Sequence, residues 1–142
     1  MATSMLDTAI RIAAEAHAGQ VDKAGAPYVL HPLRVMLSVE GEEARTTAVL
    51  HDVMEDCPGW TRDRLAAAGI SETVLKALDC VTKRDGEDYK DFVLRAGANP
   101  IARVVKMADL TDNMDLRRIA HPTERDHLRI AKYREAYALL EG

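Results

Sequence analysis

The sequence predicts an all-α fold of about eight helices, and three observations support this fold class. Strand signals are nearly absent, because aromatic residues make up 4% of the chain and β-branched residues seldom alternate with polar ones. Apolar residues recur instead at helical spacing, and proline, serine or threonine stand where helices would begin. The 142 residues suffice for a single domain with a buried core, which we expect to span residues 1–142.

The expected elements follow in chain order. Ser4 can cap a first helix over residues 4–18, in which apolar residues repeat with a helical period. Residues 19–30 are rich in turn formers and are predicted to be a loop that leads to His31. The chain then shows helical patterns, several of them with a proline at the first position or a Ser or Thr cap, over residues 32–39, 43–55, 61–68, 71–82, 87–97, 100–118 and 123–140.

A polar cluster interrupts the apolar helix predicted over 43–55. His51, Asp52, Glu55 and Asp56 stand at i, i+1, i+4 and i+5, which places them along one side of that helix. The flanking residues are apolar or nearly so, and a buried carboxylate is costly unless it binds a cation or a metal. A His-Asp pair alone is more often a surface pair than a metal ligand, but these surroundings favour metal binding.

Two further candidate ligands stand elsewhere in the chain. They are His31, which precedes a proline, and Asp109, which lies in the segment Lys-Met-Ala-Asp-Leu-Thr-Asp-Asn. With the His-Asp pair they would form a set of two imidazoles and two carboxylates, which suits Mn, Fe(II) or Zn and leaves coordination positions free for water or substrate. Lys106 and Asn113 share the helix face of Asp109. The alternatives are an ordinary ion pair of Lys106 with Asp109 or Asp112, and a solvated Asn113.

The acidic pair Glu55-Asp56 has a chemical interpretation and a plain one. One turn beyond the ligands, a carboxylate could hold a water molecule and accept its proton. The plain alternative is a solvated acidic end of the helix, although acids at a helix C-terminus oppose the macrodipole.

These residues together carry a resemblance to a known family that runs nearly the length of the chain. The chain resembles the HD-domain metal-dependent phosphohydrolases of the RelA/SpoT hydrolase type, particularly their small single-domain members. The matching residues, in order, are Ala16-His17, Gly19-Gln20, Lys23, Gly25, Pro27-Tyr28, His31-Pro32-Leu33, Leu50-His51-Asp52-Val53, Glu55-Asp56, Val81-Thr82, Tyr89, Val105-Lys106-Met107-Ala108-Asp109 and Asn113.

The resemblance implies roles for individual residues. It implies a Mn(II) ion held by His31, His51, Asp52 and Asp109, with Glu55 and Asp56 beside the reactive water. It also implies substrate contacts, for which the candidates in this chain are Lys23, Asn113, Arg129 and Tyr133. Lys23 and Arg129 could equally be ordinary surface residues, and Tyr133 an aromatic residue at the edge of the core. His17 is expected to pack near the loop, where it could act as a hydrogen-bond partner of the ligands.

One residue departs from the family pattern. The family usually has an arginine before Lys23, where it stacks on guanine and compensates phosphate charge, and this chain has Asp22. A carboxylate does neither. The metal-hydrolase interpretation is unaffected by this substitution, whereas recognition of guanosine tetraphosphate is weakened.

The composition of the chain argues against nucleic-acid and membrane partners. A net charge of −4 argues against a duplex nucleic-acid binder. No apolar run approaches a membrane span, Asp7 and Arg11 interrupt any signal-peptide core, and Cys57 and Cys80 lack metal-binding spacing, so we expect a cytoplasmic protein without a membrane partner. Oligomeric state is left open by the sequence.

The leading hypothesis is therefore Mn(II)-dependent hydrolysis of the 3′-pyrophosphate of ppGpp or a related nucleotide. The alternatives are a phosphohydrolase for another nucleotide or a phosphorylated cofactor, which Asp22 favours, and a catalytically silent nucleotide-sensing module, which the Glu55-Asp56 pair disfavours. No synthetase activity is expected, because the family's synthetase domain follows the hydrolase and this sequence stops at Gly142.

Overall fold

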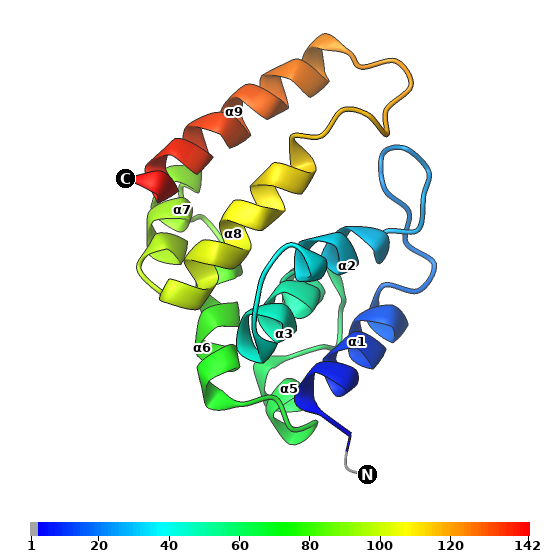
Figure 1. The fold of residues 1–142 in the computed structure, drawn as a ribbon, viewed down its shortest axis with the longest axis vertical. Helices are drawn as coiled ribbons and strands as arrows, with labels where there is room; N and C mark the ends of the chain where they lie inside the picture. The colour runs from blue at the N-terminus through cyan, green and yellow to red at the C-terminus, as the bar shows by residue number, and fades with distance from the viewer. Residues whose placement is uncertain (1–2) are drawn as a thin grey trace.

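The computed structural model describes residues 3–142, and this part of the chain is all α, as predicted (Figure 1). Its helices are α1 (Met5–Ala16), α2 (Leu30–Leu37), α3 (Glu42–Leu50), α4 (Val53–Asp56), α5 (Arg62–Ala67), α6 (Glu72–Val81), α7 (Tyr89–Gly97), α8 (Pro100–Asn113) and α9 (Glu124–Glu141). The only extended pairing among the described residues is an isolated antiparallel bridge between Val21 and Pro27, which closes the loop before α2.

The helices begin where the sequence supplies a cap. Ser4 and Thr123 each accept a hydrogen bond from the third helical residue in a capping box, and Thr61 and Ser71 cap α5 and α6 as predicted. The Asn99 side chain accepts bonds from two backbone amides of α8, whose first residue is proline. These local signals account for helix starts that lie within two residues of the prediction.

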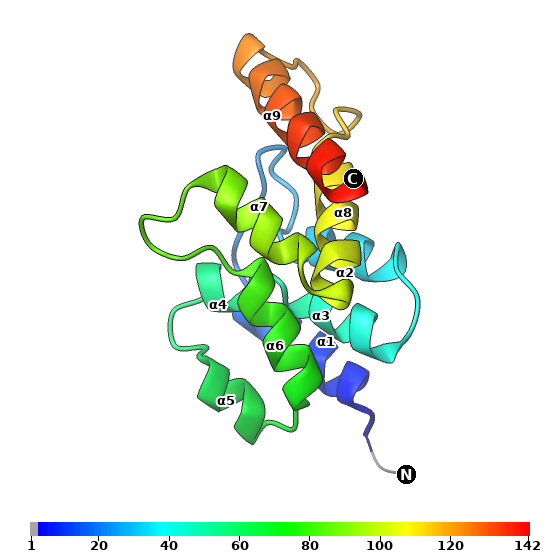
Figure 2. The same cartoon turned by 90° about the vertical axis from the view of Figure 1, so that its left-hand side faces the viewer.

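Helix α3 is the centre of the fold. Its last five residues, Thr46 to Leu50, are fully buried. It packs against α1, α2, α6 and α8, so the residues directly after it are enclosed by several elements (Figure 2). Helices α7, α8 and α9 form a second, smaller cluster around Val93, Leu110, Ala136 and Leu140.

Two predicted helices are shorter than expected. The prediction of one helix over 43–55 is wrong, because α3 ends at Leu50 and α4 starts at Val53, with His51 and Asp52 in the turn between them. The helix predicted over 100–118 ends at Asn113. There the Asp115 side chain accepts the backbone N–H of Arg117 at 2.9 Å, an alternative to helical bonding that favours a turn.

Within residues 3–142, none of the helices combines the length and the apolar character that crossing a bilayer requires.

Candidate metal centre and catalytic cleft

Three elements bring the four predicted ligands together. His31 is the second residue of α2, His51 and Asp52 form the turn between α3 and α4, and Asp109 lies in the C-terminal half of α8. His31, His51 and Asp109 are each about 5% exposed or less, and the Asp52 side chain is 15% exposed. Because α3 packs on both α2 and α8, the turn after α3 holds its side chains between the other two ligands.

Both imidazoles turn the same nitrogen inward. His51 Nδ1 lies 2.6 Å from the carbonyl oxygen of Ala48, and His31 Nδ1 lies 2.6 Å from a carboxylate oxygen of Asp112. With Nδ1 engaged by these acceptors, each Nε2 faces the carboxylates, where it would offer its lone pair to a bound metal ion. His51 Nε2 is buried and has no hydrogen-bond partner among the described residues.

The spacing of the inward atoms matches a metal centre. His51 Nε2 lies 3.1 Å from Asp52 Oδ2 and 3.3 Å from Asp109 Oδ1, while His31 Nε2 lies 2.9 Å from the same Asp109 oxygen and 3.8 Å from Asp52 Oδ2. A metal ion at about 2.0–2.2 Å from each ligand would hold neighbouring ligand atoms roughly 3.0–3.6 Å apart. His31, His51 and Asp52 offer ligand atoms that lie within 4.8 Å of one another, and Asp109 Oδ1 lies 2.9 and 3.3 Å from the two imidazole Nε2 atoms, so this cluster is a candidate site for one divalent ion.

The charges of the cluster point to the same conclusion. Burial alone would lower the pKa of His51, but Asp52 and Asp109 outweigh it and raise this pKa well above its ordinary value. Burial alone would raise the pKa of Asp109, yet Lys106 and His51 hold it well below the usual range. Two carboxylates that stay ionised in a buried site require positive charge beside them, which Lys106 and protonated His51 supply here and which a divalent cation would supply in place of the imidazole proton.

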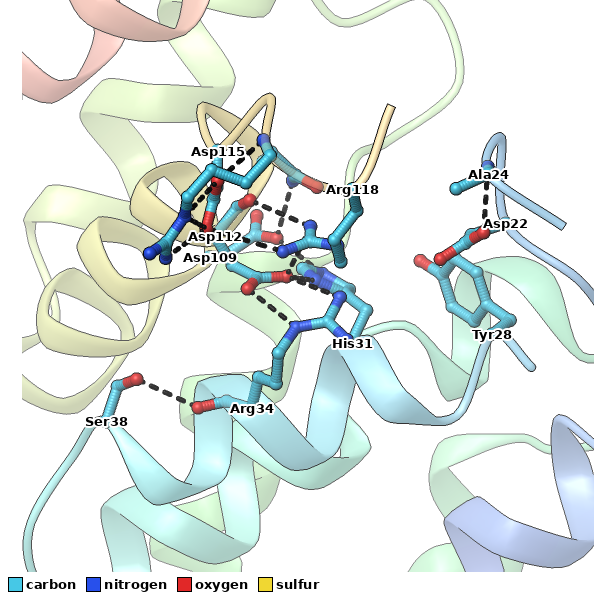
Figure 3. Close-up of polar contacts among 12 residues, drawn as sticks. Asp22, Ala24, Tyr28, His31, Arg34, Ser38, Asp109, Asp112, Asp115 and Arg118 are labelled. Atoms are coloured by element: carbon cyan, nitrogen blue, oxygen red, sulfur yellow. Dashed lines mark hydrogen bonds and ion pairs between the residues drawn. The ribbon is translucent and has the colours of Figure 1, made fainter. Parts of the chain in front are cut away.

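Further residues orient the ligands. Tyr28 donates its hydroxyl to Asp52 Oδ2 at 2.5 Å. Asp112, which accepts from His31, is itself held by Arg34 through two bonds of 2.8 and 3.0 Å (Figure 3). The sequence analysis did not identify these roles. Tyr28 stands in a matching motif and Asp112 lies one turn from Asp109, but only the fold shows which ligand each one contacts.

The two residues on the helix face of Asp109 both contact its carboxylate. Lys106 Nζ lies 3.0 Å from Asp109 Oδ2, so the expected ion pair is formed with Asp109 and not with Asp112. Asn113 donates to Asp109 Oδ1 at 2.9 Å and is half-buried, so its alternative as a freely solvated side chain is wrong.

Glu55 and Asp56 open into a cleft of about 330 Å³ whose floor includes His31, Asp52 and Asp109. Burial, followed by the charge of Asp52, raises the pKa of both carboxyls, and the charge of Asp56 raises that of Glu55 further. Because α4 is a single turn separate from α3, Glu55 and Asp56 do not stand at the C-terminus of a long helix and do not oppose its macrodipole. The carboxylates instead reach the cleft because the break at residues 51–52 redirects the chain.

A second cleft of about 410 Å³ meets the first one at the metal centre. Tyr28, His31, Asn113 and Tyr133 line both clefts, whereas Lys23 and Arg129 line only the second. Arg129 is also paired with Asp126 at 2.8 Å. All four predicted substrate contacts thus lie on the walls of clefts that converge on the ligands.

Comparison with known proteins gives relatives that share this segment. The chain is 33% identical over 135 residues to the guanosine-3′,5′-bis(diphosphate) 3′-pyrophosphohydrolase of Haemophilus influenzae, which covers 85% of the chain and 20% of the relative. It is 32% identical over 132 residues to a probable GTP pyrophosphokinase of Mycobacterium leprae, covering 84% of the chain and 16% of the relative. The bifunctional (p)ppGpp synthase/hydrolase SpoT of Escherichia coli is 30% identical to the chain over 122 residues, which cover 77% of the chain and 17% of the relative.

The chain is a homologue of the SpoT-type proteins. It spans between 16 and 20% of the length of these three relatives. A solved structure described as a metazoan ortholog of SpoT that hydrolyses ppGpp superposes with a TM-score of 0.79 over 99% of this chain and 86% of that one, at 19% identity, and so shares the fold. No family model matches the chain.

Asp22, where the chain departs from the pattern of the family that it resembles, forms hydrogen bonds within its own loop. Its Oδ1 accepts the backbone N–H groups of Ala24 and Ala26, each at 2.9 Å (Figure 3). His17, expected near this loop, is buried there. Its Nδ1 lies 2.8 Å from Gln20 Oε1, and its ring centroid lies 5.1 Å from that of Tyr28.

Proposed function

We propose that this chain is a Mn(II)-dependent hydrolase that cleaves the 3′-pyrophosphate group from ppGpp and releases pyrophosphate. The observation that carries the proposal is the convergence of two imidazole Nε2 atoms and two carboxylates at the junction of two clefts, one acidic and one lined with Lys23 and Arg129. The relatives' names supply the nucleotide, and the geometry supplies the hydrolytic chemistry.

His31, His51, Asp52 and Asp109 would hold the Mn(II) ion. When bound, such an ion lowers the pKa of water and neutralises charge that develops on a phosphoryl group. Glu55, whose pKa is raised by burial and by neighbouring acids, is suited to accept the proton of the attacking water. Tyr28 keeps the Asp52 carboxylate in place through its hydroxyl.

The two clefts give the reaction a direction. Water held by Glu55 and Asp56 attacks phosphorus from the acidic cleft, a new P–O bond forms, and the bond from phosphorus to the ribose 3′-oxygen breaks. The departing 3′-oxygen takes up a proton and leaves the nucleoside in the second cleft, where Lys23, Arg129 and Tyr133 contact it. An in-line displacement needs the nucleophile and the leaving group on opposite sides of phosphorus, and in this proposal each cleft takes one side.

The test is pyrophosphate release from ppGpp by metal-stripped protein reloaded with Mn(II). We expect release that depends on Mn(II) and falls about 100- to 10,000-fold in Glu55→Gln, which keeps the shape of the side chain but removes the base. Glu43→Gln, an exposed acid at the start of α3, is the matched control. Equal activity in Glu55→Gln would refute this assignment.

A second candidate is hydrolysis of another phosphorylated nucleotide or cofactor, and Asp22 favours it. Since its carboxylate is bonded within its own loop, residue 22 offers no cation to a guanine or a phosphate. A panel of nucleotides with 2′-, 3′- and 5′-phosphates distinguishes the two candidates by relative kcat/KM. The purely sensing module is disfavoured, because both acids of the Glu55-Asp56 pair line the cleft beside the ligands.

A further inference from the structure

Tyr89 places an unsatisfied hydroxyl beside the catalytic cleft. The residue begins α7 and lines the same cleft as Glu55 and Asp56. Its hydroxyl oxygen is buried and has no hydrogen-bond partner anywhere in residues 3–142. A buried polar group without a partner destabilises a folded protein, so phenylalanine at this position would give a fold at least as stable. The hydroxyl is therefore explained best if it binds a ligand in the cleft.

Lys132 is the cation next to this hydroxyl. Its ammonium lies over the Tyr89 ring, 4.0 Å from the ring centroid, and it has no carboxylate within ion-pair distance among the described residues. The side chain extends from α9 and is exposed, so it can turn from the ring face toward an anion in the cleft. Two other lysines line the cleft: Lys106 is already paired with Asp109, and Lys83 donates its backbone N–H to Glu55.

The wall lies one side chain beyond the metal centre. Lys106 contacts Asp109 and lies 4.9 Å from the centroid of the Phe92 ring, which in turn packs edge-on against Tyr89 at 6.2 Å between centroids. The two phosphoryl groups of a diphosphate share one bridging oxygen. A diphosphate whose first phosphoryl group sits at the metal centre therefore directs its second group to an adjacent wall of the same cleft.

We propose that the Tyr89 hydroxyl and the Lys132 ammonium bind the distal phosphate of the diphosphate that the metal centre cleaves. The inference deepens the proposed function and rests on it for the position of the first phosphate. Burial raises the pKa of Tyr89, so the phenol keeps its proton and donates it to a phosphate oxygen. This pair makes the cleft selective for diphosphates over monophosphates.

The kinetic test compares a nucleoside 3′-diphosphate with the corresponding 3′-monophosphate. Tyr89→Phe and Lys132→Gln should each lower kcat/KM for the diphosphate by about tenfold or more, mostly through KM, and leave the monophosphate nearly unchanged. Tyr137→Phe and Lys90→Gln are matched controls, since neither residue lines the cleft. Equal losses with both substrates, or no loss, would overturn the inference.

Two readouts do not depend on turnover. Isothermal titration of Mn(II)-loaded protein with inorganic pyrophosphate should show weaker binding in Tyr89→Phe, with orthophosphate binding unchanged. Thermal unfolding of Tyr89→Phe should occur at the same temperature as wild type or higher, because the variant loses only an unpaired buried hydroxyl. A lower unfolding temperature would show that the hydroxyl is structural and would contradict the inference.

These readouts also separate the two proposals. If ppGpp is not hydrolysed but pyrophosphate binding still depends on Tyr89, the diphosphate site stands and the proposed substrate is wrong. If ppGpp is hydrolysed and Tyr89→Phe changes neither pyrophosphate binding nor the preference for diphosphates, the proposed function stands and the diphosphate site is wrong.

Discussion

At the scale of single residues, Asp112 fixes the ring of His31. It accepts the Nδ1 proton at 2.6 Å and is anchored by Arg34, so the inward orientation of Nε2 depends on it. Asp112→Ala should weaken Mn(II) binding about 10- to 100-fold, and Asp112→Asn should restore part of the affinity because its amide oxygen can accept the same bond. Calorimetric titration with Mn(II) measures the affinity of each variant.

The control for Asp112 is Asp63→Ala, an exposed acid on α5 far along the chain from the ligands. It removes the same charge without touching His31. If Asp112→Ala bound Mn(II) as tightly as Asp63→Ala, the role of Asp112 in orienting the ligand would be wrong.

Asp22 should act through the shape of its loop. Because its Oδ1 holds two backbone amides, Asp22→Ala should release the loop around Lys23, increase amide hydrogen exchange over residues 22–28 and raise KM several-fold with kcat little changed. Asp22→Asn keeps an acceptor oxygen and should behave like wild type. If Asn were as impaired as Ala, the charge of Asp22 would matter and its proposed role as a loop staple would fail.

The residue scale also shows what sequence reasoning could achieve. The four proposed ligands and the Glu55-Asp56 pair could be proposed from the sequence because their types and spacing are unusual in an apolar context, and the fold brings them to one cleft. Tyr28 and Asp112 were not given roles, since each contacts a residue distant in the chain. Local patterns do not encode such contacts.

At the scale of elements, Arg95 ties α7 to the end of α6. It donates to the carbonyl oxygens of Asp79 and Thr82 at 2.6 and 2.8 Å, and it forms two further bonds with Glu87. This contact shapes the segment that leads into Tyr89. The wall of the cleft that carries Tyr89 therefore depends on an ion pair outside the cleft.

The Glu87–Arg95 pair gives stability a defined pH dependence. Hydrogen bonds from Arg95 lower the pKa of Glu87 from 4.5 to about 2 in the folded protein. Because the folded pKa is depressed, the stabilisation is complete above pH 4.5 and is lost as the pH falls toward 2. Urea unfolding should show a shallower loss of stability over this range in Glu87→Gln than in wild type.

The matched control for this pH profile is Glu40→Gln, whose side chain is 97% exposed. It should leave the profile of wild type unchanged. A Glu87→Gln profile that coincided with that of Glu40→Gln would mean that the ion pair does not contribute to acid stability.

Element prediction failed at two places for the same physical reason. At the end of α3 the His51 ring contacts the carbonyl oxygen of Ala48, and after α8 the Asp115 side chain accepts the backbone N–H of Arg117. In both places a side chain takes a backbone group that could have continued the helix. Periodicity continues through such breaks, so it overestimates helix length. The break at residues 51–52 is also what turns Asp52, Glu55 and Asp56 into one cleft.

At the scale of the whole molecule, the proposed metal centre joins parts of the fold that are distant in sequence. Its ligands come from α2, the turn after α3, and α8. The all-α fold class could be predicted from composition and periodicity, whereas the packing of α3 at the centre could not, because it results from non-local burial.

Mn(II) should accordingly stabilise the whole chain. At a free Mn(II) concentration of about 100 times Kd, binding to the folded state alone adds about 2.7 kcal/mol to the free energy of unfolding. Thermal unfolding with and without chelator measures the shift, and Asp109→Asn should reduce it strongly. A shift of equal size in Asp109→Asn would indicate that the ion binds elsewhere.

The most direct test of the central claim is a Mn(II) titration of metal-free protein with ppGpp hydrolysis as the readout. The account predicts that pyrophosphate release rises with each addition and saturates at about one Mn(II) per chain, and that Asp52→Asn neither binds the ion tightly nor releases pyrophosphate. Full activity without metal, or in Asp52→Asn, would contradict the assignment of these residues as a catalytic metal centre.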